Sequence, residues 1–310
     1  MALVGLVWLL VLALAWFGLA DPACRQAPDR PDATGRAAAE ASRPSEGARP
    51  PYDFARPTLS HALPGRLEEI SGIALVDDRH VAAIEDNDGD LYLIDFRTGE
   101  VVDERPFEGK GDYEDVERAG DRLYVLKSDG DLFEIEDWQK KEPDEVHRRK
   151  TDVPKGCDAE GLALHPDEDR LLIACKERAG KRLDGFRTIF AYDLEAAELE
   201  KDPAIVLSLA ELETFMQASE HAGGGETELD YEHDAQSFKP SAIRFHPVTG
   251  ELYVLSSVTK AVAVLSPEGH IRGVYPLSGR LLPQPEGLAF LPNGDLLISS
   301  EGRVGKGSLH

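Results

Sequence analysis

Apolar and polar residues alternate along most of the chain after residue 65, in short runs that turn residues separate. Runs such as HVAAIED, RLYVLKS, RLLIACK and ELYVLSS are rich in Val, Ile, Leu and Tyr, with Gly, Pro or Asp at their ends. A period of two over four to eight residues is typical of β-strands that bury one face. The pattern therefore predicts a chain built mainly of short strands.

This strand pattern recurs five times. The repeats open on EEISGIAL at 68–75, DYEDVERA at 112–119, DAEGLALHP at 158–166, KPSAIRFHP at 239–247 and QPEGLAFLP at 284–292. Successive steps of 43, 46, 81 and 45 residues separate the positions just before the first strand, which are Ser71, Glu114, Glu160, Ser241 and Glu286. A strand-built period near 45 residues predicts a β-propeller.

We expect an all-β fold, a five-bladed β-propeller over residues 52–310. The last repeat ends early, and the segment Tyr52–Leu63 can supply its missing outer strand, because an unpaired end would leave an exposed edge. The 81-residue step leaves a six-bladed propeller as the alternative. Its extra length falls mostly in 210–237, which begins like a helix and continues as a Gly-rich and acidic stretch. We interpret 210–237 as an insertion.

Two local features allow sharper predictions. Asp88-Gly89 and Asp129-Gly130 each lie between apolar runs, which predicts tight hairpins whose two turn residues have positive φ. Cys157 and Cys175 lie before and at the end of a predicted hairpin. The expected register of that hairpin leaves the two cysteines several residues apart, so a disulfide is not favoured.

The N-terminus predicts export. No charged residue occurs from Ala2 to Ala20, and 19 residues in a helix span about 28 Å, close to a bilayer core. We expect residues 1–20 to be a signal anchor in the cell inner membrane, with a cleaved signal peptide and a secreted or periplasmic protein as the alternative. Arginines that follow the run favour the opposite orientation by the positive-inside rule. We nevertheless expect the propeller to face the periplasm or cell exterior, behind a disordered linker at 21–51.

The net charge of the chain limits the classes of partner that it can bind. The chain has 34 Lys and Arg against 58 Asp and Glu, a formal net charge of −24. A nucleic-acid binder needs a basic face to meet phosphates, so we expect no nucleic-acid partner. The acidic balance suits a divalent cation, or serves solubility alone.

Several of the acids recur at equivalent positions of the repeats, and such positions meet around a propeller's axis. We expect a ring of carboxylates at the mouth of the central channel, with the candidate metal ligands Glu69, Asp86, Glu114, Glu160, Glu286 and Glu301. Converging oxygen ligands suit Ca²⁺ as cofactor. The alternative is a metal-free polar channel whose acids are neutralised by Lys127, Lys176 and Lys239.

No familiar catalytic motif is present in the sequence. The chain has no G-x-S-x-G elbow, no H-E-x-x-H and no phosphate-binding P-loop. If the protein is an enzyme, metal-assisted hydrolysis is the available route, because a bound cation lowers the pKa of a water and steadies a developing oxyanion.

The same segments carry a family resemblance. EISG at Glu69, DYEDVE at Asp112, AEGLALHP at Ala159, KPSAIRFHPVTGELYVLSS at Lys239 and QPEGLAF at Gln284 resemble the SdiA-regulated family of phytase-like β-propellers. The resemblance implies an exported or inner-membrane-anchored protein, and it implies a link to calcium response and homeostasis. More distantly, the layout is similar to calcium-dependent propeller phytases and regucalcin-type lactonases.

Three functions follow as hypotheses. The first is a membrane-anchored extracytoplasmic propeller that binds calcium and acts in calcium response or homeostasis, or as a binding module. The second is a metal-dependent hydrolase, either a phytase-like phosphoesterase or a lactonase. The third is an interaction platform for a protein partner, using the rim and the insertion at 210–237.

Overall fold

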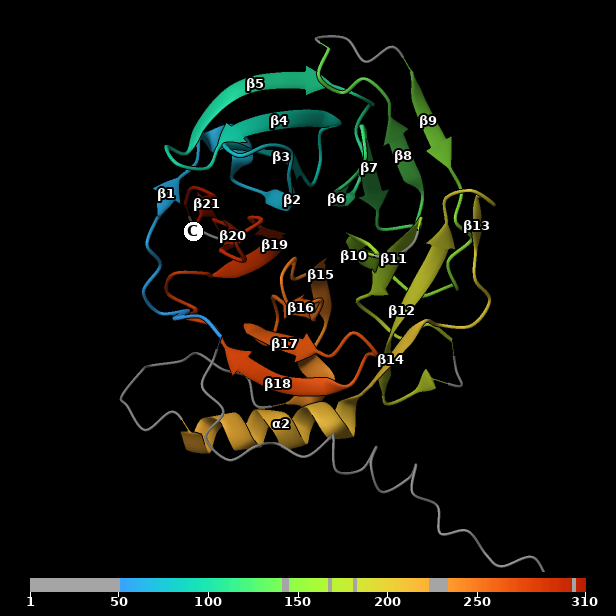
Figure 1. The fold of residues 1–310 in the computed structure, drawn as a ribbon, viewed down its shortest axis with the longest axis vertical. Helices are drawn as coiled ribbons and strands as arrows, with labels where there is room; N and C mark the ends of the chain where they lie inside the picture. The colour runs from blue at the N-terminus through green and yellow to red at the C-terminus, as the bar shows by residue number, and fades with distance from the viewer. Residues whose placement is uncertain (1–50, 141–144, 167–168, 181–182, 223–233, 303–304) are drawn as a thin grey trace, which may run out of the picture. The chain divides into compact units, whose positions relative to one another are not determined.

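The computed structural model describes residues 51–140, 145–166, 169–180, 183–222, 234–302 and 305–310. These residues form a five-bladed β-propeller made of antiparallel sheets, as the repeats predict (Figure 1). The apolar helix expected at 1–20 lies outside the described residues, as does the linker expected at 21–51 apart from Pro51. Within the described residues, no helix combines the length and apolar character needed to cross a membrane.

The period-two runs form the strands of four successive blades, and consecutive strands pair antiparallel except in blade 3, where the last two strands both pair with the third strand. Blade 1 comprises β2 (Ile70–Leu75), β3 (His80–Glu85), β4 (Asp90–Asp95) and β5 (Glu100–Pro106). Blade 2 comprises β6 (Tyr113–Ala119), β7 (Arg122–Lys127), β8 (Leu132–Ile135) and β9 (Val146–Arg149). Blade 3 comprises β10 (Ala159–Leu164), β11 (Arg170–Cys175), β12 (Phe186–Asp193), β13 (Glu198–Leu199) and β14 (Ile205–Ser208). Blade 4 comprises β15 (Pro240–Phe245), β16 (Leu252–Ser256), β17 (Ala261–Leu265) and β18 (Ile271–Pro276).

Blade 5 joins the beginning of the propeller to its end. It comprises β19 (Gln284–Phe290), β20 (Leu296–Glu301), β21 (Ser308–Leu309) and β1 (His61–Ala62). His61 pairs with Leu309 and Ala62 with Ser308, so the predicted closure by the segment before the first repeat is confirmed. This pairing gives β21 a partner on each side and removes an open edge.

The long step between the third and fourth repeats holds helix rather than a sixth blade. α2 (Leu209–Ala222) and the 3₁₀ turn η3 (Ala235–Ser237) follow β14, and the described residues between β14 and β15 contain no strand. α2 packs on β18 (Figure 1), and its Leu212, Phe215 and Met216 join the buried cluster between blades 3 and 4. The six-bladed alternative is therefore wrong.

Alternation along each strand lets one sheet pack against both of its neighbours. On β7, Leu123 and Val125 join the cluster shared with blade 1, whereas Tyr124 and Leu126 join the cluster shared with blade 3. Successive side chains of a strand point to opposite faces, which is why both faces read as apolar. A buried Leu or Val contributes about 1.5–3 kcal/mol, so these shared clusters hold the blades together.

The expectation about the cysteines is wrong, because Cys157 and Cys175 form a disulfide. The hairpin register is as expected, but a β-bulge places Ala159 opposite Cys175. Asp158 then has a φ of 51°, and the turn of the backbone at this residue leaves the Cα atoms of the two cysteines 4.7 Å apart. Neither the bulge nor the left-handed aspartate is visible in the apolar pattern.

The two Asp-Gly hairpins are present, but their predicted backbone geometry is only partly right. Gly130 has a φ of 89°, whereas Asp129, Asp88 and Gly89 do not have positive φ. Gly89 is required for space instead, because a Cβ at this position would collide with the carbonyl of Glu108.

Candidate functional site

The five innermost strands stand around the propeller axis (Figure 1). Each of β2, β6, β10, β15 and β19 contacts the next, and β19 contacts β2. Because the blades repeat one topology, the first residues of these strands gather at one end of the axis. Backbone hydrogen bonds join neighbouring blades there: the Tyr113 amide donates to the Asp86 carbonyl at 2.9 Å, and the Ala159 amide to the Ser128 carbonyl at 2.9 Å.

A β-bulge marks the start of every inner strand. The register shifts at the residue just before the apolar run, which in four of the blades is Glu114, Glu160, Ser241 or Glu286. In blade 1 the shift lies between Ile70 and Ile73, on either side of Ser71. A bulge leaves one residue out of the ladder and re-aims its side chain. The column identified in the sequence is therefore set by a repeated backbone irregularity.

Carboxylates dominate this end of the axis. We call the following set the acidic rim: Glu69, Asp86, Asp112, Glu114, Asp158, Glu160, Glu286 and Glu301, together with Lys176. All six predicted metal ligands belong to it. These carboxylates repel one another around the rim. The charges of neighbouring rim acids raise the pKa values of Asp86, Glu114, Glu286 and Glu301.

The side of the rim formed by blades 1 and 2 holds a carboxyl pair. Burial raises the pKa of Asp86 to about 6, with further increases from a hydrogen bond to Asp112 and from the charges of Asp112 and Glu69. Glu69 is exposed in the turn before β2 and accepts a hydrogen bond of 2.7 Å from the Asn87 amide. The pKa of Asp86 is therefore raised both by partial burial and by the acids that surround it.

The other rim acids whose pKa is raised are more deeply buried. Burial raises the pKa of Glu114 to about 9 and that of Glu286 well above its ordinary value, and the Glu160 charge adds to both shifts. Burial raises the pKa of Glu160 to about 7 against the pull of Lys176. Burial also raises the pKa of Glu301 to about 7, with help from Asp86 and Glu69.

Lys176 is the basic side chain that faces these acids. It forms an ion pair with Glu160. Burial lowers its pKa, but the charge and hydrogen bond of Glu160, with the charges of Asp158 and Glu286, together outweigh that effect and raise it. The other two lysines named from the sequence are engaged elsewhere. Lys127 lies 3.8 Å from Asp129, and Lys239 pairs with Glu177. The disulfide joins Cys157 and Cys175, the residues directly before Asp158 and Lys176, so it restrains the backbone at this part of the rim.

The rim acids are close enough to repel but do not converge on one point. In the described part of the chain, three ligand atoms lie within 4.8 Å of one another only at Glu136, Glu145 and His147. That trio lies at and beside β9, the outer strand of blade 2, and all three side chains are at least partly exposed. Sequence columns did not indicate it, because it belongs to one blade alone.

Sequence reasoning missed a charged network further along the axis. Arg244 of β15 is buried and forms an ion pair with Glu117 of β6, and its guanidinium also donates to the carbonyls of Leu288 at 2.9 Å and Ile73 at 3.0 Å. Asp115 lies 3.4 Å from Arg244.

The two acids of this network also bind blade 3. Asp115 accepts a hydrogen bond of 2.7 Å from the Leu162 amide, and Glu117 one of 3.0 Å from the Leu164 amide. The signal was available in the repeats: three residues after the first column stand Ala74, Glu117, Ala163, Arg244 and Ala289. Two opposite charges in a column of alanines indicate a pair across the axis.

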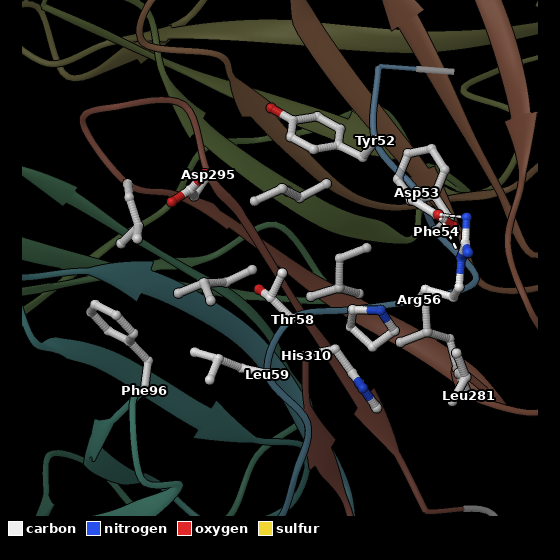
Figure 2. Close-up of a pocket in the computed structure, with 16 residues that line it drawn as sticks. Tyr52, Asp53, Phe54, Arg56, Thr58, Leu59, Phe96, Leu281, Asp295 and His310 are labelled. Carbon is white, nitrogen blue, oxygen red and sulfur yellow. Dashed lines mark hydrogen bonds and ion pairs between the residues drawn. The ribbon is translucent and has the colours of Figure 1, made fainter. Parts of the chain in front are cut away.

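A separate cavity, shown in Figure 2, lies where the propeller closes, and its volume is about 270 Å³. Segment 52–59, blade 5 and Phe96 line it, and most of the lining is apolar. The Tyr52 hydroxyl donates to the Gly294 carbonyl at 2.6 Å, and Arg56 pairs with Asp53 at 2.7 Å. The Tyr52 contact holds the segment against blade 5, and the cavity shares none of its lining residues with the acidic rim.

Comparisons with known proteins agree with the fold. A family model described as SdiA-regulated matches residues 52–304. No curated protein matches the chain in sequence.

Similar solved structures are distant. A luciferin-regenerating enzyme is 11% identical with a TM-score of 0.44, covering 78% of this chain and 91% of that one. A gluconolactonase from Xanthomonas campestris is 13% identical with a TM-score of 0.46, covering 77% and 71%. A streptogramin B lyase is 12% identical with a TM-score of 0.42, covering 80% and 67%. Likeness at this level says nothing about the chemistry of this chain.

Proposed function

The chain belongs to the SdiA-regulated family, and from that premise we propose that it is an extracytoplasmic propeller that binds Ca²⁺ at its acidic rim. Its role in this proposal is calcium response or homeostasis, or calcium-dependent binding of a partner. The observation that carries the proposal is the charge imbalance of the rim, where eight carboxyls surround one lysine.

The electrostatics favour a cation. Repulsion between Glu114, Glu160 and Glu286 adds to the cost of burying them, so each resists ionisation. A divalent cation would stabilise the ionised forms directly, because an opposite charge within a few ångströms lowers a carboxyl pKa. Ca²⁺ accepts six to eight oxygen ligands in flexible geometry, which suits a ring of carboxylates from separate blades.

The rim would hold the ion loosely. In the described residues no three of its carboxylates lie within 4.8 Å of one another, so the residues that would hold the ion, Glu114, Glu160, Glu286 and Glu301, would share it with water. We therefore expect an affinity typical of extracellular calcium modules, with a dissociation constant of about 10⁻⁴–10⁻³ M.

Location follows from two features. The uncharged run from Ala2 to Ala20 supports an anchor in the inner membrane, with a cleaved signal as the alternative. The disulfide between Cys157 and Cys175 supports an oxidising compartment, where such bonds form and persist. A fusion of the first 51 residues to alkaline phosphatase tests the orientation: activity indicates export, and an inactive fusion contradicts it.

Thermal unfolding tests the cation. Protein from Pro51 to His310 contains every described element, so it is melted after chelation, then with Ca²⁺ and with Mg²⁺. A ligand at about 100 times its dissociation constant stabilises by about 2.7 kcal/mol, so Ca²⁺ at such a level should raise Tm by about 5–10 °C. Glu145→Gln is the matched control, since it alters the outer trio only. A rise abolished by Glu145→Gln would move the site away from the rim.

A second function rests on one specific observation. The pKa values of Glu160 and Glu301 are raised to about 7, the range that suits a general acid or base near neutral pH. With a bound cation, this pair would serve a metal-dependent hydrolase acting on a phosphate ester or a lactone. Turnover of such a substrate that is lost in both Glu160→Gln and Glu301→Gln would favour this function over calcium binding alone.

A further inference from the structure

A second polar cavity opens beside the acidic rim, between blades 3 and 4. Its volume is about 600 Å³, within the range of small-ligand sites. The charged side chains that line it are mainly basic, unlike the rim, and they are Lys155, Arg178, Arg187, Lys239, Glu177 and Asp184. We call it the basic pocket.

Arg187 forms the most buried charge of the basic pocket. It lies on β12 and is 6% exposed. Its guanidinium donates to the backbone carbonyls of Phe238 at 2.8 Å, Gln236 at 2.6 Å and Phe186 at 3.5 Å, and no described carboxylate pairs with it. A guanidinium has five N–H donors, so two remain after these three bonds.

A buried cation with little counter-charge is costly. Burial lowers the pKa of Arg187, and the charge of nearby Glu177 offsets that lowering only in part. The carbonyl dipoles offset part of the desolvation cost of the guanidinium, and an anion in the pocket would offset the rest. The Arg187 side chain also holds the residues around η3 against β12, so any test of the pocket needs a variant outside this contact.

The charges of the pocket leave an excess of two. Lys239 pairs with Glu177, and Arg178 lies 3.1 Å from Asp184. Lys155 is exposed, and no described carboxylate pairs with it. Lys155 and Arg187 therefore supply two positive charges that the pocket does not neutralise, within a chain whose formal charge is −24.

We propose that the basic pocket binds a phosphate-type dianion, either inorganic phosphate or a phosphate monoester, through Arg187 at its base and Lys155 at its edge. The guanidinium fork matches the oxygens of a phosphate group, and two uncompensated positive charges balance a dianion. The formal charge of −24 disfavours anion binding to the chain as a whole, so a site with a local positive excess stands out. The pocket is independent of the proposed calcium site, because none of its charged residues belongs to the acidic rim.

Calorimetric titration of inorganic phosphate into chelator-treated protein tests this proposal. We expect saturable binding at millimolar or lower phosphate. Lys155→Glu should weaken it at least about tenfold, because it reverses a charge facing the dianion. Lys201→Glu is the matched control: Lys201 is also exposed but lies outside the pocket, so the same charge reversal should leave the affinity within about twofold.

Arg187→Lys gives a second, independent variant. It keeps the charge and loses the fork, so we expect weaker phosphate binding. If this variant fails to fold, the comparison of Lys155→Glu with Lys201→Glu still decides the matter. Phenyl phosphate in place of inorganic phosphate distinguishes the two sources, since clearly tighter binding of the ester identifies a monoester as the ligand.

Three results would overturn the proposal. The first is no saturable heat up to about 10 mM phosphate, which corresponds to negligible affinity. The second is an affinity that Lys155→Glu leaves unchanged. The third is phosphate binding that appears only when Ca²⁺ is added, which would assign the anion to a rim-bound cation and not to the basic pocket.

Discussion

Arg244 and Glu117 form an ion pair across the propeller axis, from β15 in blade 4 to β6 in blade 2. Through its other hydrogen bonds Arg244 also reaches carbonyls of blades 1 and 5, and Glu117 accepts an amide of blade 3. One buried guanidinium and its partner thus contact all five blades. The pair lies beyond the acidic rim along the inner strands, so it separates the rim from the other end of the axis.

Removing Arg244 should be strongly destabilising. Arg244→Met leaves Asp115 and Glu117 buried without a cation, and breaking a buried pair in this way costs about 3–5 kcal/mol. Adding Glu117→Gln to the same protein should recover part of that loss, because one uncompensated charge is removed. Denaturant unfolding measures both variants. A loss below about 1 kcal/mol for the single variant would mean that the pair does not tie the blades together.

Stability without a cation should fall as pH rises. Glu114, Glu160 and Glu301 have folded pKa values of about 9, 7 and 7, above the ordinary 4.5. The folded protein therefore binds more protons than the unfolded chain, so this contribution is complete below pH 4.5 and is lost as pH rises to about 9. Tm measured in chelator across this window should decline, and Ca²⁺ should reduce the decline. A Tm that rises through the window would contradict this.

Substituting one rim acid distinguishes the effect of its ionisation on Tm from other effects of pH. Glu114→Gln removes the acid with the pKa of about 9, so in chelator it should raise Tm at pH 8 by about 2–4 °C and leave Tm at pH 4.5 nearly unchanged. The comparison of the two pH values is its own control, since a packing defect would lower Tm at both.

Lys176 should act as a built-in competitor of the cation. Lys176→Met leaves Glu160 without its ion-pair partner and makes the rim more negative. We expect this variant to be less stable in chelator and to bind Ca²⁺ about three- to tenfold more tightly, because a positive charge near the ion is gone. Calcium titration of the two proteins measures the ratio. Unchanged affinity would place the ion away from Lys176.

The disulfide should contribute to stability. Cys157 and Cys175 are both buried and enclose a loop with a sequence separation of 18. A loop of that size corresponds to about 3 kcal/mol in the chain-entropy account. Replacing both cysteines by serine should lower the free energy of unfolding by about 2–4 kcal/mol. Thiol titration of unfolded protein from Pro51 to His310 should find no free thiol, and two thiols per chain would contradict the assignment.

Fold prediction succeeded where the sequence repeats. A period near 45 residues and strict alternation set the blades and their shared clusters, and the short last repeat indicated closure through segment 52–63. The disulfide was missed because it depends on a bulge and on a left-handed Asp158, which are single-residue backbone events.

For the candidate site, the sequence predicted only which repeat positions meet at the axis. Equivalent positions placed Glu114, Glu160 and Glu286 together, but the sequence did not separate the roles of the lysines. Lys176 meets the acids because its strand end adjoins Glu160, whereas Lys239 turns to Glu177. Which acid a lysine pairs with depends on the direction of its side chain, and the spacing of residues along the sequence does not reveal that direction. The basic pocket was missed because most of its residues, including Lys155 and Arg187, come from loops and from β12 and do not recur at equivalent positions of the repeats.

Calorimetric titration of Ca²⁺ into chelator-treated protein, with Mg²⁺ as the control ion, tests the central claim most directly. We predict saturable Ca²⁺ binding that is lost in the double variant Glu160→Gln with Glu286→Gln and retained in Glu145→Gln. No saturable Ca²⁺ heat, or heat that the double variant leaves unchanged, would contradict a calcium site at the acidic rim.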